Sequence, residues 1–577
     1  SHQTQPSSLV WAFHDPTDTW QELGKVTSPI SGGMLAQEAD ASYALIGAQT
    51  ADQQAATAQR LLFTRSTKPM KPIDWTIVVI YFLIVAGVGT HFARKQTSSE
   101  EFALGNRNVK WWAAGISLFA SGVSTISFMA IPALIACIGL GTTGPVFFLI
   151  IGVVISAFLT YPLLRRLNIT STFEYLEHRF GLSLRLIGSF VGIITQLMGR
   201  IGIVVMLPAL AISAMTGLDP MIAILLTGIV TTLYSTAGGF EAVIWTDVAQ
   251  GILMFAGFIA LGVLAFINIE GGIPAFLEFG HDLDRFNFFL TNFDITTHMM
   301  WFAIAGQIIG IMSFASDQAT AQRVLSTPMR DVRKLAFLFG GFAIFSALIV
   351  GFVGISLFAF FKSRPDLLTP IMKNDQIVPL FILSKVPLGM AGLLIATMFA
   401  AAMSTVSTSV NSCAVMFGED FYKRFRKNST SKEEMRVMQV VSILVGAFGT
   451  GLAMWLLSRP MPTLWESFAR IMAIVGGGFV GVYILGMFTR RSHELGAIIG
   501  VAVSFFMAYY VQKIPFDIHY SGLMIITVGS CVLSGYVSSL IIPWKRKELR
   551  GLTVWNQITN EEAEARIAAA EHNNASS

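Results

Sequence analysis

Polar residues of three kinds stand inside long apolar stretches of this sequence, where their burial is costly without a partner. Arg200 lies in the middle of one stretch, and Asp247 lies near the start of another. Five of the six residues from 404 to 409 carry a hydroxyl group. Ionisable side chains within membrane segments are rare and mark ion or substrate sites. These residues are therefore the candidates for the chemistry of this protein.

Arg200 is the candidate for binding a negatively charged solute. Its guanidinium is planar and permanently charged, so it matches the two oxygens of a carboxylate. No acidic residue lies in the same stretch. We therefore expect a bound solute to supply the partner, with water or backbone as a poor substitute in the empty protein. The alternative is an arginine that bonds to backbone carbonyls of an unwound neighbouring helix.

The hydroxyl groups after residue 400 form a candidate site for a sodium ion. In an apolar medium, the oxygen ligands of sodium come from hydroxyl groups and from the carbonyls of broken helices. Ser404, Thr405 and Thr408 follow Ala401 at positions i+3, i+4 and i+7, so these residues share one helix face. The alternative is that each hydroxyl bonds a carbonyl of its own helix.

The composition indicates that membrane helices position these residues. The chain has 577 residues, of which 53% are hydrophobic and 13% charged, whereas a soluble protein carries about a quarter charged residues. After residue 72, thirteen apolar stretches have the length of about 18 or more residues that crosses the hydrocarbon core. They cover about residues 74–93, 111–136, 143–164, 186–214, 219–237, 245–268, 297–321, 335–361, 388–414, 437–457, 466–488, 495–512 and 521–542.

The basic residues of the loops predict the orientation of these helices. Between residues 94 and 550, one set of loops carries 24 basic residues and the other carries 8, and the richer side is cytoplasmic. The richer set includes Arg165, Arg166 and Arg323. We therefore predict an extracytoplasmic segment over residues 1–72, a transmembrane domain over 73–545 and a cytoplasmic tail over 546–577.

Two of the predicted helices are interrupted by small and hydroxyl residues. They cover residues 111–136 and 297–321, and they stand five helices apart. Weakened helices at matching positions indicate inverted repeats with a binding site at the membrane midplane. The alternative is close helix packing through small residues.

Four motifs, in this order, resemble the solute:sodium symporter family. They are EEFALGNRNVKWWAAG at 100–115, GGFEAVIWTDVAQ at 238–250, DQATAQR at 317–323 and AAAMSTVSTSVNS at 400–412. The resemblance implies an all-α polytopic membrane protein with the fold of the bacterial leucine transporter, with two inverted five-helix repeats among about thirteen transmembrane helices. The motif GRIGIVVMLPALAIS at 199–213 is most similar to bacterial sialic acid transporters, which implies the inner membrane of a bacterium.

The resemblance implies two sodium sites. In the first, the ligands are backbone carbonyls of Ala120, Val123 and Ala401 together with the hydroxyls of Ser404 and Thr405. In the second, Asp247 joins the hydroxyls of Ser404, Ser407 and Thr408. The alternative for Asp247 is an interfacial residue that caps its helix.

The resemblance also implies a substrate site in which Arg200 holds the carboxylate of sialic acid. The other residues of this site are Gly122, Ser124, Ser127, Thr142 and Gln307. The sequence departs from the sialic acid branch at Gly122, where that branch has a hydroxyl, and at Val146, where an ungapped alignment places a glutamine. These departures concern the identity of the solute more than its carboxylate.

Residues 11–47 resemble one blade of a kelch propeller. An aromatic residue before Asp-Pro, a tryptophan, a Gly-Gly pair and a tyrosine follow one another in this segment. A single repeat cannot bury its own face, so we expect a remnant or the last blade of a longer protein. The alternative is a leader that is rich in proline and glycine by chance.

The sequence thus favours a sodium-coupled symporter that imports a carboxylated sugar by alternating access, with sialic acid as the preferred solute. The alternatives are symport of a neutral sugar or of an amino acid such as proline, and a membrane sensor that keeps the transporter fold. We find no nucleophile–base pair, metal-ligand cluster or phosphate loop in the sequence, and we predict that the protein is not an enzyme.

Overall fold

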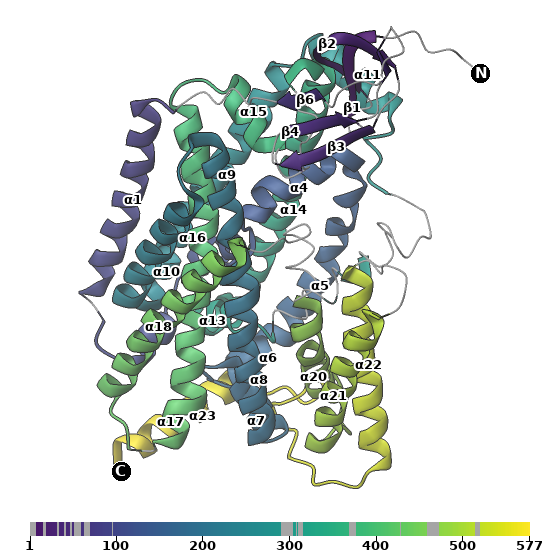
Figure 1. The fold of residues 1–577 in the computed structure, drawn as a ribbon. Coiled ribbons are helices and arrows are strands. Elements are labelled where there is room, and N and C mark those ends of the chain that lie inside the picture. Colours follow the sequence, from purple (N-terminus) through teal and green to yellow (C-terminus); the bar gives the residue numbers. More distant parts are fainter. Residues whose placement is uncertain are drawn as a thin grey trace.

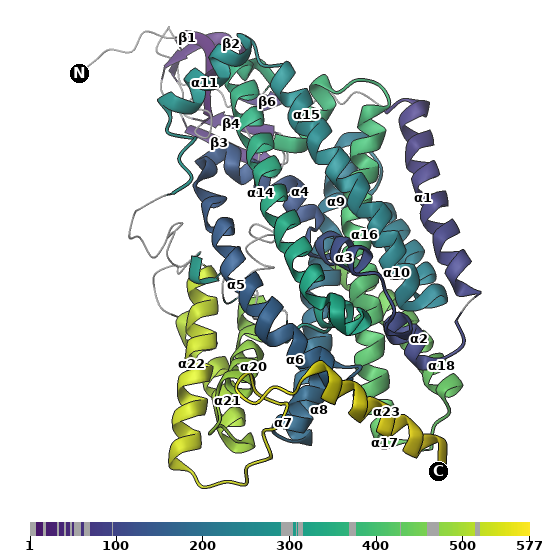
Figure 2. The same ribbon diagram turned by 180° about the vertical axis from the view of Figure 1, so that it is seen from behind.

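The computed structural model of the protein has a long bundle of helices with a group of strands at one end (Figure 1). It describes six strands before residue 63 and residues 70–94, 96–289, 304–306, 309, 315–367, 377–426, 428–458, 472–513 and 520–576. In Figure 1, the C-terminus lies at the end of the bundle opposite the strands. The same arrangement is seen from behind in Figure 2.

The main helices of the first half begin with α1 along one edge of the bundle (Figure 1). They are α1 (Pro72–Ala93), α2 (Ser99–Leu104), α3 (Trp111–Gly122), α4 (Thr125–Ile138), α5 (Leu149–Ile155), η5 (Ser156–Thr160), α6 (Tyr161–Arg166), α7 (Thr172–Arg179), α8 (Leu182–Ile194), η6 (Thr195–Ile203), α9 (Met206–Thr216), α10 (Pro220–Ile267) and α11 (Gly272–Asp282).

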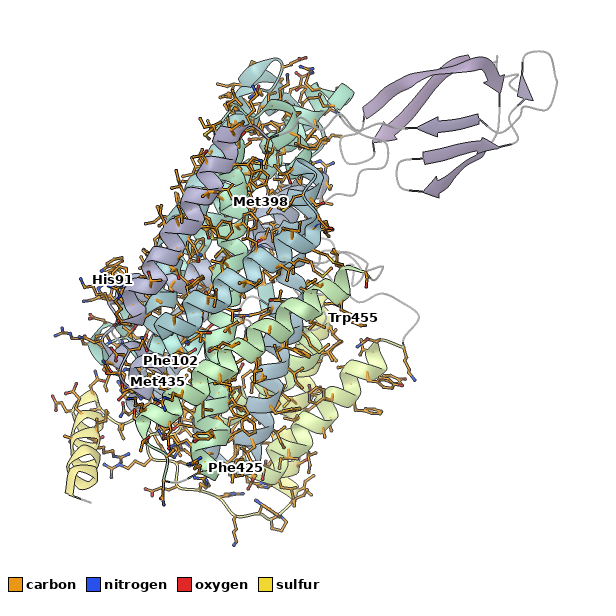
Figure 3. All side chains as sticks on the ribbon, turned by 60° about the vertical axis from the view of Figure 1, so that its left-hand side comes forward. His91, Phe102, Met398, Phe425, Met435 and Trp455 are labelled. Atoms are coloured by element: carbon orange, nitrogen blue, oxygen red, sulfur yellow. The ribbon has the colours of Figure 1, made fainter. Side chains whose placement is uncertain are left out.

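The second half contains the long helix α16, which carries Met398, and Phe425 lies beyond the end of α16, in α17 and farther from the strands (Figure 3). Its main helices are α13 (Gln318–Ser326), α14 (Val332–Ser363), α15 (Ile377–Lys385), α16 (Met390–Met416), η10 (Phe417–Tyr422), α17 (Lys423–Phe425), α18 (Ser431–Leu457), η11 (Met472–Gly476), α20 (Gly477–Phe488), α21 (Glu494–Val511), α22 (Tyr520–Ile541) and α23 (Asn560–Ser576).

Nine helical stretches among the described residues are long and apolar enough to cross a membrane, and the bent pair α3 and α4 adds a tenth. One of the nine, α10, has 48 residues, whereas about 20 residues are enough for one helix to cross the hydrocarbon core. Its non-helical Gly239 divides it between the predicted spans 219–237 and 245–268. The predicted span 297–321 lies mostly outside the described residues, so the count of thirteen stays a prediction.

The break between α3 and α4 is the feature of the fold that most affects the site. α3 ends at Gly122, Val123 has an extended backbone, and α4 begins at Thr125. The two helices are bent by 60°. A break of this kind leaves carbonyls of the last turn of α3 without helical partners, so they are available to other groups.

The strands differ in arrangement from a single kelch blade. β1 (Ser7–His14), β2 (Thr19–Ser31) and β5 (Gln49–Thr50) form one sheet, and β3 (Met34–Ala39), β4 (Ser42–Ile46) and β6 (Gln59–Leu62) form another. A propeller blade is one four-stranded sheet. The strand order therefore does not support the kelch resemblance.

Small residues bring α10 and α18 into close contact. A Cβ added at Gly446 of α18 would overlap the side chain of Thr232 in α10, and one added at Gly228 of α10 would overlap Thr450 of α18. Membrane helices associate through close packing of this kind because lipid provides no hydrophobic drive between them.

Two alanine substitutions in α18 test this contact. Gly446→Ala forces a methyl group against Thr232, and we expect a loss of about 1–3 kcal/mol from overpacking in the thermal unfolding of purified protein. Gly451→Ala is the matched control, because nothing lies within 4 Å of its added Cβ. The control should be neutral or slightly stabilising, since alanine is the better helix former. Equal melting temperatures for the two variants would contradict the packing argument.

Candidate functional site

The predicted first sodium site lies where α16 faces the break between α3 and α4. Oγ of Ser404 lies 3.0 Å from the carbonyl oxygen of Ala120 and 3.2 Å from that of Ala401. Oγ1 of Thr405 lies 3.4 Å from the carbonyl oxygen of Ser121 and 3.2 Å from that of Ala401. All five residues are buried. Each hydroxyl thus bonds its own helix and also reaches across to α3, so a small cluster of oxygens joins the two elements.

The remaining residues that were predicted near the broken helix do not belong to this cluster of oxygens. Val123 stands in the break itself, where its N–H donates to the carbonyl of Phe119. Ser124 precedes the first residue of α4, and its carbonyl accepts from the N–H of Ser127. Thr142 follows α4 in a short helical turn. Gln307 lies outside the described residues.

Arg200 lies in the wide π-helical turn η6 and is paired with a carboxylate. Its Nη2 donates to Oδ2 of Asp317 over 3.1 Å, and the two side chains are 20% and 19% exposed. Asp317 directly precedes α13, in the second half of the chain. The expectation that only water or backbone faces Arg200 is therefore wrong, because the partner comes from a different segment, 117 residues further along the chain.

Two further side chains donate hydrogen bonds to Asp317, and a third bonds to one of these two. Nε2 of Gln196 donates to Oδ1 of Asp317 over 2.8 Å, and Oγ1 of Thr320 donates to Oδ2 over 2.9 Å. Oγ of Ser409, on α16, donates to Oε1 of Gln196 over 2.8 Å. The carboxylate of Asp317 thus accepts three hydrogen bonds, of which only one comes from Arg200.

Arg200 and Asp317 line a cavity of about 270 Å³. The cavity has a polar end and a mostly apolar wall, which is typical of sites for small molecules. Gly122, Ser124, Ser127 and Thr142 do not line it. Its lining residues are Phe173, Gly188, Val191, Gly192, Thr195, Gln196, Arg200, Ser316, Asp317, Gln318, Met416, Met472, Gly476, Gly477, Phe479, Val480 and Met524.

Asp247 forms a second buried ion pair. Its Oδ2 lies 2.8 Å from Nη2 of Arg323 and accepts a hydrogen bond of 2.6 Å from Oγ of Ser117. Both charged side chains are fully buried. The position of Asp247 inside α10, remote from the helix start, excludes a capping role. The assignment of Arg323 to a cytoplasmic loop is also wrong, since the residue lies within the buried helix α13.

Of the hydroxyls predicted to join Asp247, that of Thr408 bonds to Arg323 of this ion pair, whereas those of Ser404 and Ser407 bond to backbone carbonyls. Oγ1 of Thr408 accepts from Nη2 of Arg323 over 2.6 Å and so belongs to the same cluster. Oγ of Ser407 donates to the carbonyl of Ser404, and Ser404 itself faces α3. Among the described residues, Oδ1 of Asp247 is buried and accepts no hydrogen bond.

Ser117, Gln196, Asp317 and Arg323 are among the site residues that sequence reasoning missed. Asp317 and Arg323 are the first and last residues of the motif DQATAQR, which carried part of the family resemblance. The signal for Asp317 was its position inside the predicted span 297–321. A search of all predicted spans for an acidic partner of Arg200, instead of its own span alone, could have found it. Ser117 carries no signal of its own, because single serines are common in membrane helices that pack closely.

The family comparison covers most of the transmembrane domain. The model of the sodium:solute symporter family matches residues 102–504. The sodium/sialic acid symporter NanT of Aliivibrio fischeri is 31% identical over 480 residues, which cover 81% of this chain and 93% of that protein. The sodium-coupled monocarboxylate transporter 1 of Homo sapiens is 31% identical over 450 residues, which cover 76% of this chain and 73% of that protein.

Solved structures of other transporters share this fold. A Na⁺-coupled sialic acid symporter, in a substrate-bound outward-open state, superposes with a TM-score of 0.77 at 28% identity and covers 83% of this chain and 100% of its own. Mhp1, a transporter of the nucleobase-cation-symport-1 family, superposes with a TM-score of 0.51 at 14% identity. The predicted fold class, a multi-pass helical membrane protein of the leucine-transporter type, is confirmed, and the chain belongs to the sodium:solute symporter family.

Proposed function

We propose that this protein is a symporter that couples the import of sialic acid, or a closely similar carboxylated sugar, to sodium. The observation that carries the proposal is the position of Arg200, a permanent cation that lines a mostly apolar cavity between helices. The relatives support it, since their names describe carriers of sialic acid and of monocarboxylates. We place the protein in the inner membrane of a bacterium, with the strands outside and α23 in the cytoplasm.

Sodium binds first, in this account, between α3 and α16. The ligands are the carbonyls of Ala120, Val123 and Ala401 and the hydroxyls of Ser404 and Thr405. The ion takes over carbonyl oxygens that now accept hydrogen bonds from these hydroxyls. It therefore fixes the broken helix against α16, and a fixed arrangement raises the affinity of any solute that binds only in that arrangement.

A second sodium ion binds at Asp247 in the same account. Oδ1 of Asp247 supplies a ligand that is not committed to Arg323 or Ser117, and Thr408 lies in the same cluster. Ser404 and Ser407 complete the predicted set. Two sodium ions with one carboxylate carry a net charge of +1, so transport would respond to the membrane potential by up to about 2.3 kcal/mol per 100 mV.

Binding measurements on Arg200 variants test the carboxylate site. Arg200→Lys keeps the charge but loses the planar fork, so we expect weaker binding of sialic acid in sodium buffer. Arg200→Ala should nearly abolish binding, because the solute carboxylate would be buried without a partner. Isothermal titration calorimetry of the purified protein gives the dissociation constants, and Arg330→Ala, whose side chain is 87% exposed, is the control. Equal binding of sialic acid and its methyl ester would replace this account with transport of a neutral solute.

A pair of substitutions separates the structural and ionic roles of Asp247. Asp247→Asn leaves Arg323 buried without its counter-charge, and we expect a loss of about 3–5 kcal/mol of stability, which Arg323→Gln in the same chain should largely restore. The Hill coefficient for sodium in uptake assays should fall towards one in both the single and the double variant. A wild-type Hill coefficient of one would contradict the second sodium site, as would a cooperative response that survives in the double variant.

A further inference from the structure

We propose that Asp317 is a built-in competitor for Arg200, which the carboxylate of the solute must displace, and that its release is relayed to the first sodium site. The proposal rests on the carboxylate-binding function of Arg200 given above. It adds a residue that sets the specificity of the site, and a physical route by which solute and sodium influence each other.

The ion pair of Arg200 and Asp317 leaves part of the guanidinium open to a better partner. The bond between Arg200 and Asp317 joins one guanidinium nitrogen to one carboxylate oxygen, at 3.1 Å. A solute carboxylate placed against the guanidinium can form two parallel bonds, which are stronger and more specific. Because both side chains line the cavity, a solute reaches Arg200 and Asp317 from the same space.

Replacing Asp317 by the solute carboxylate at Arg200 costs little free energy, because Asp317 keeps other partners. When Arg200 turns to the solute, Asp317 keeps its hydrogen bonds from Gln196 and Thr320. Its charge therefore stays partly satisfied, which keeps the exchange reversible. A neutral solute offers Arg200 no replacement for the carboxylate that it loses, so the internal pair rejects neutral solutes. Specificity of this kind arises from a penalty on the wrong ligand.

Gln196 connects Asp317 to α16. Gln196 holds Asp317 through Nε2 and accepts from Ser409 through Oε1. Oγ of Ser409 also lies 2.8 Å from the carbonyl oxygen of Thr405, whose hydroxyl belongs to the first sodium site. Gln196, Ser409 and Thr405 are all buried, so three hydrogen bonds connect the carboxylate of Asp317 to a residue that binds sodium.

The hydroxyl of Ser409 can donate its hydrogen bond in two alternative directions. Its hydroxyl carries one proton and has two acceptors, Gln196 and the backbone of Thr405. A shift of Gln196, once Asp317 releases Arg200, favours donation to one acceptor over the other. Coupling between distant sites needs an element with two discrete states that both sites bias, and the Ser409 hydroxyl is such an element.

The variant Asp317→Asn tests the competition. It removes the charge that holds Arg200 but keeps the shape of the side chain, so a larger fraction of the protein presents Arg200 to the solute. We expect sialic acid to bind at least tenfold more tightly than to the wild type in sodium buffer, measured by calorimetry. Ser412→Ala is the control, since it removes a buried hydroxyl of α16 that bonds to Gln322 and leaves Arg200, Asp317 and their hydrogen bonds in place.

Ser409→Ala tests the relay and leaves Arg200 and Asp317 unchanged. For each protein, the ratio of the dissociation constants for sialic acid in choline and in sodium buffer measures the coupling. We expect this ratio to fall at least fivefold in Ser409→Ala and in Asp317→Asn, and to remain at the wild-type value in Ser412→Ala.

The outcomes separate this proposal from the function on which it rests. Failure of the wild type to bind sialic acid in sodium would overturn both. Normal wild-type binding, together with weaker binding by Asp317→Asn, would overturn the competitor role alone and make Asp317 a purely structural residue. An unchanged coupling ratio in Ser409→Ala would overturn the relay.

Discussion

A charge inside an apolar helix bundle needs an opposite charge beside it, and this constraint organises the centre of the protein. Two buried or half-buried ion pairs satisfy it, Arg200 with Asp317 and Asp247 with Arg323. Each pair takes one residue from the first half of the chain and the other from the short segment 317–323. This segment, the start and body of α13, therefore links both pairs, and any movement of it changes both.

α16 connects these pairs to the broken helix. Ser404 and Thr405 reach the carbonyls of α3, Thr408 bonds to Arg323, and Ser409 bonds to Gln196. Within two turns, one helix thus contacts the proposed first sodium site, the Asp247 pair and the residues that hold Asp317. The buried position of nearly every residue of α16 keeps these contacts in fixed relation. A symporter needs this property, because the binding of ions must change the affinity of the protein for the solute.

Much of this arrangement follows from the sequence, because membrane burial makes each polar residue informative. Arg200, Asp247 and the hydroxyls after residue 400 stand out from apolar surroundings, and the structure places all of them around the broken helix and the cavity. Their partners are less visible. Asp317 and Arg323 lie at or just past the end of a predicted span, where charged residues are ordinary. Only the packing of α13 against α3 and α16 shows that Arg323 is buried and that Asp317 is partly buried.

Local backbone geometry was the other part that the sequence could not predict. The π-helical turn that carries Arg200 and the kink at Gly239 depend on tertiary contacts, which residue periodicity does not contain. The spans at 219–237 and 245–268 were predicted as separate segments, whereas the structure joins them into α10 with a kink at Gly239. The motif at 11–47 suggested a single propeller blade, but strand order depends on pairings that a short motif does not specify.

The central claim is that sodium bound between α3 and α16 drives uptake of a carboxylated sugar. Uptake of labelled sialic acid into proteoliposomes under an inward sodium gradient tests it most directly. The wild type should lose uptake when choline replaces sodium. Ser404→Ala with Thr405→Ala should need at least tenfold more sodium for half-maximal uptake. The control Ser412→Ala, which removes a hydroxyl that bonds to Gln322, should not. Uptake that is equal in sodium and choline would contradict the account.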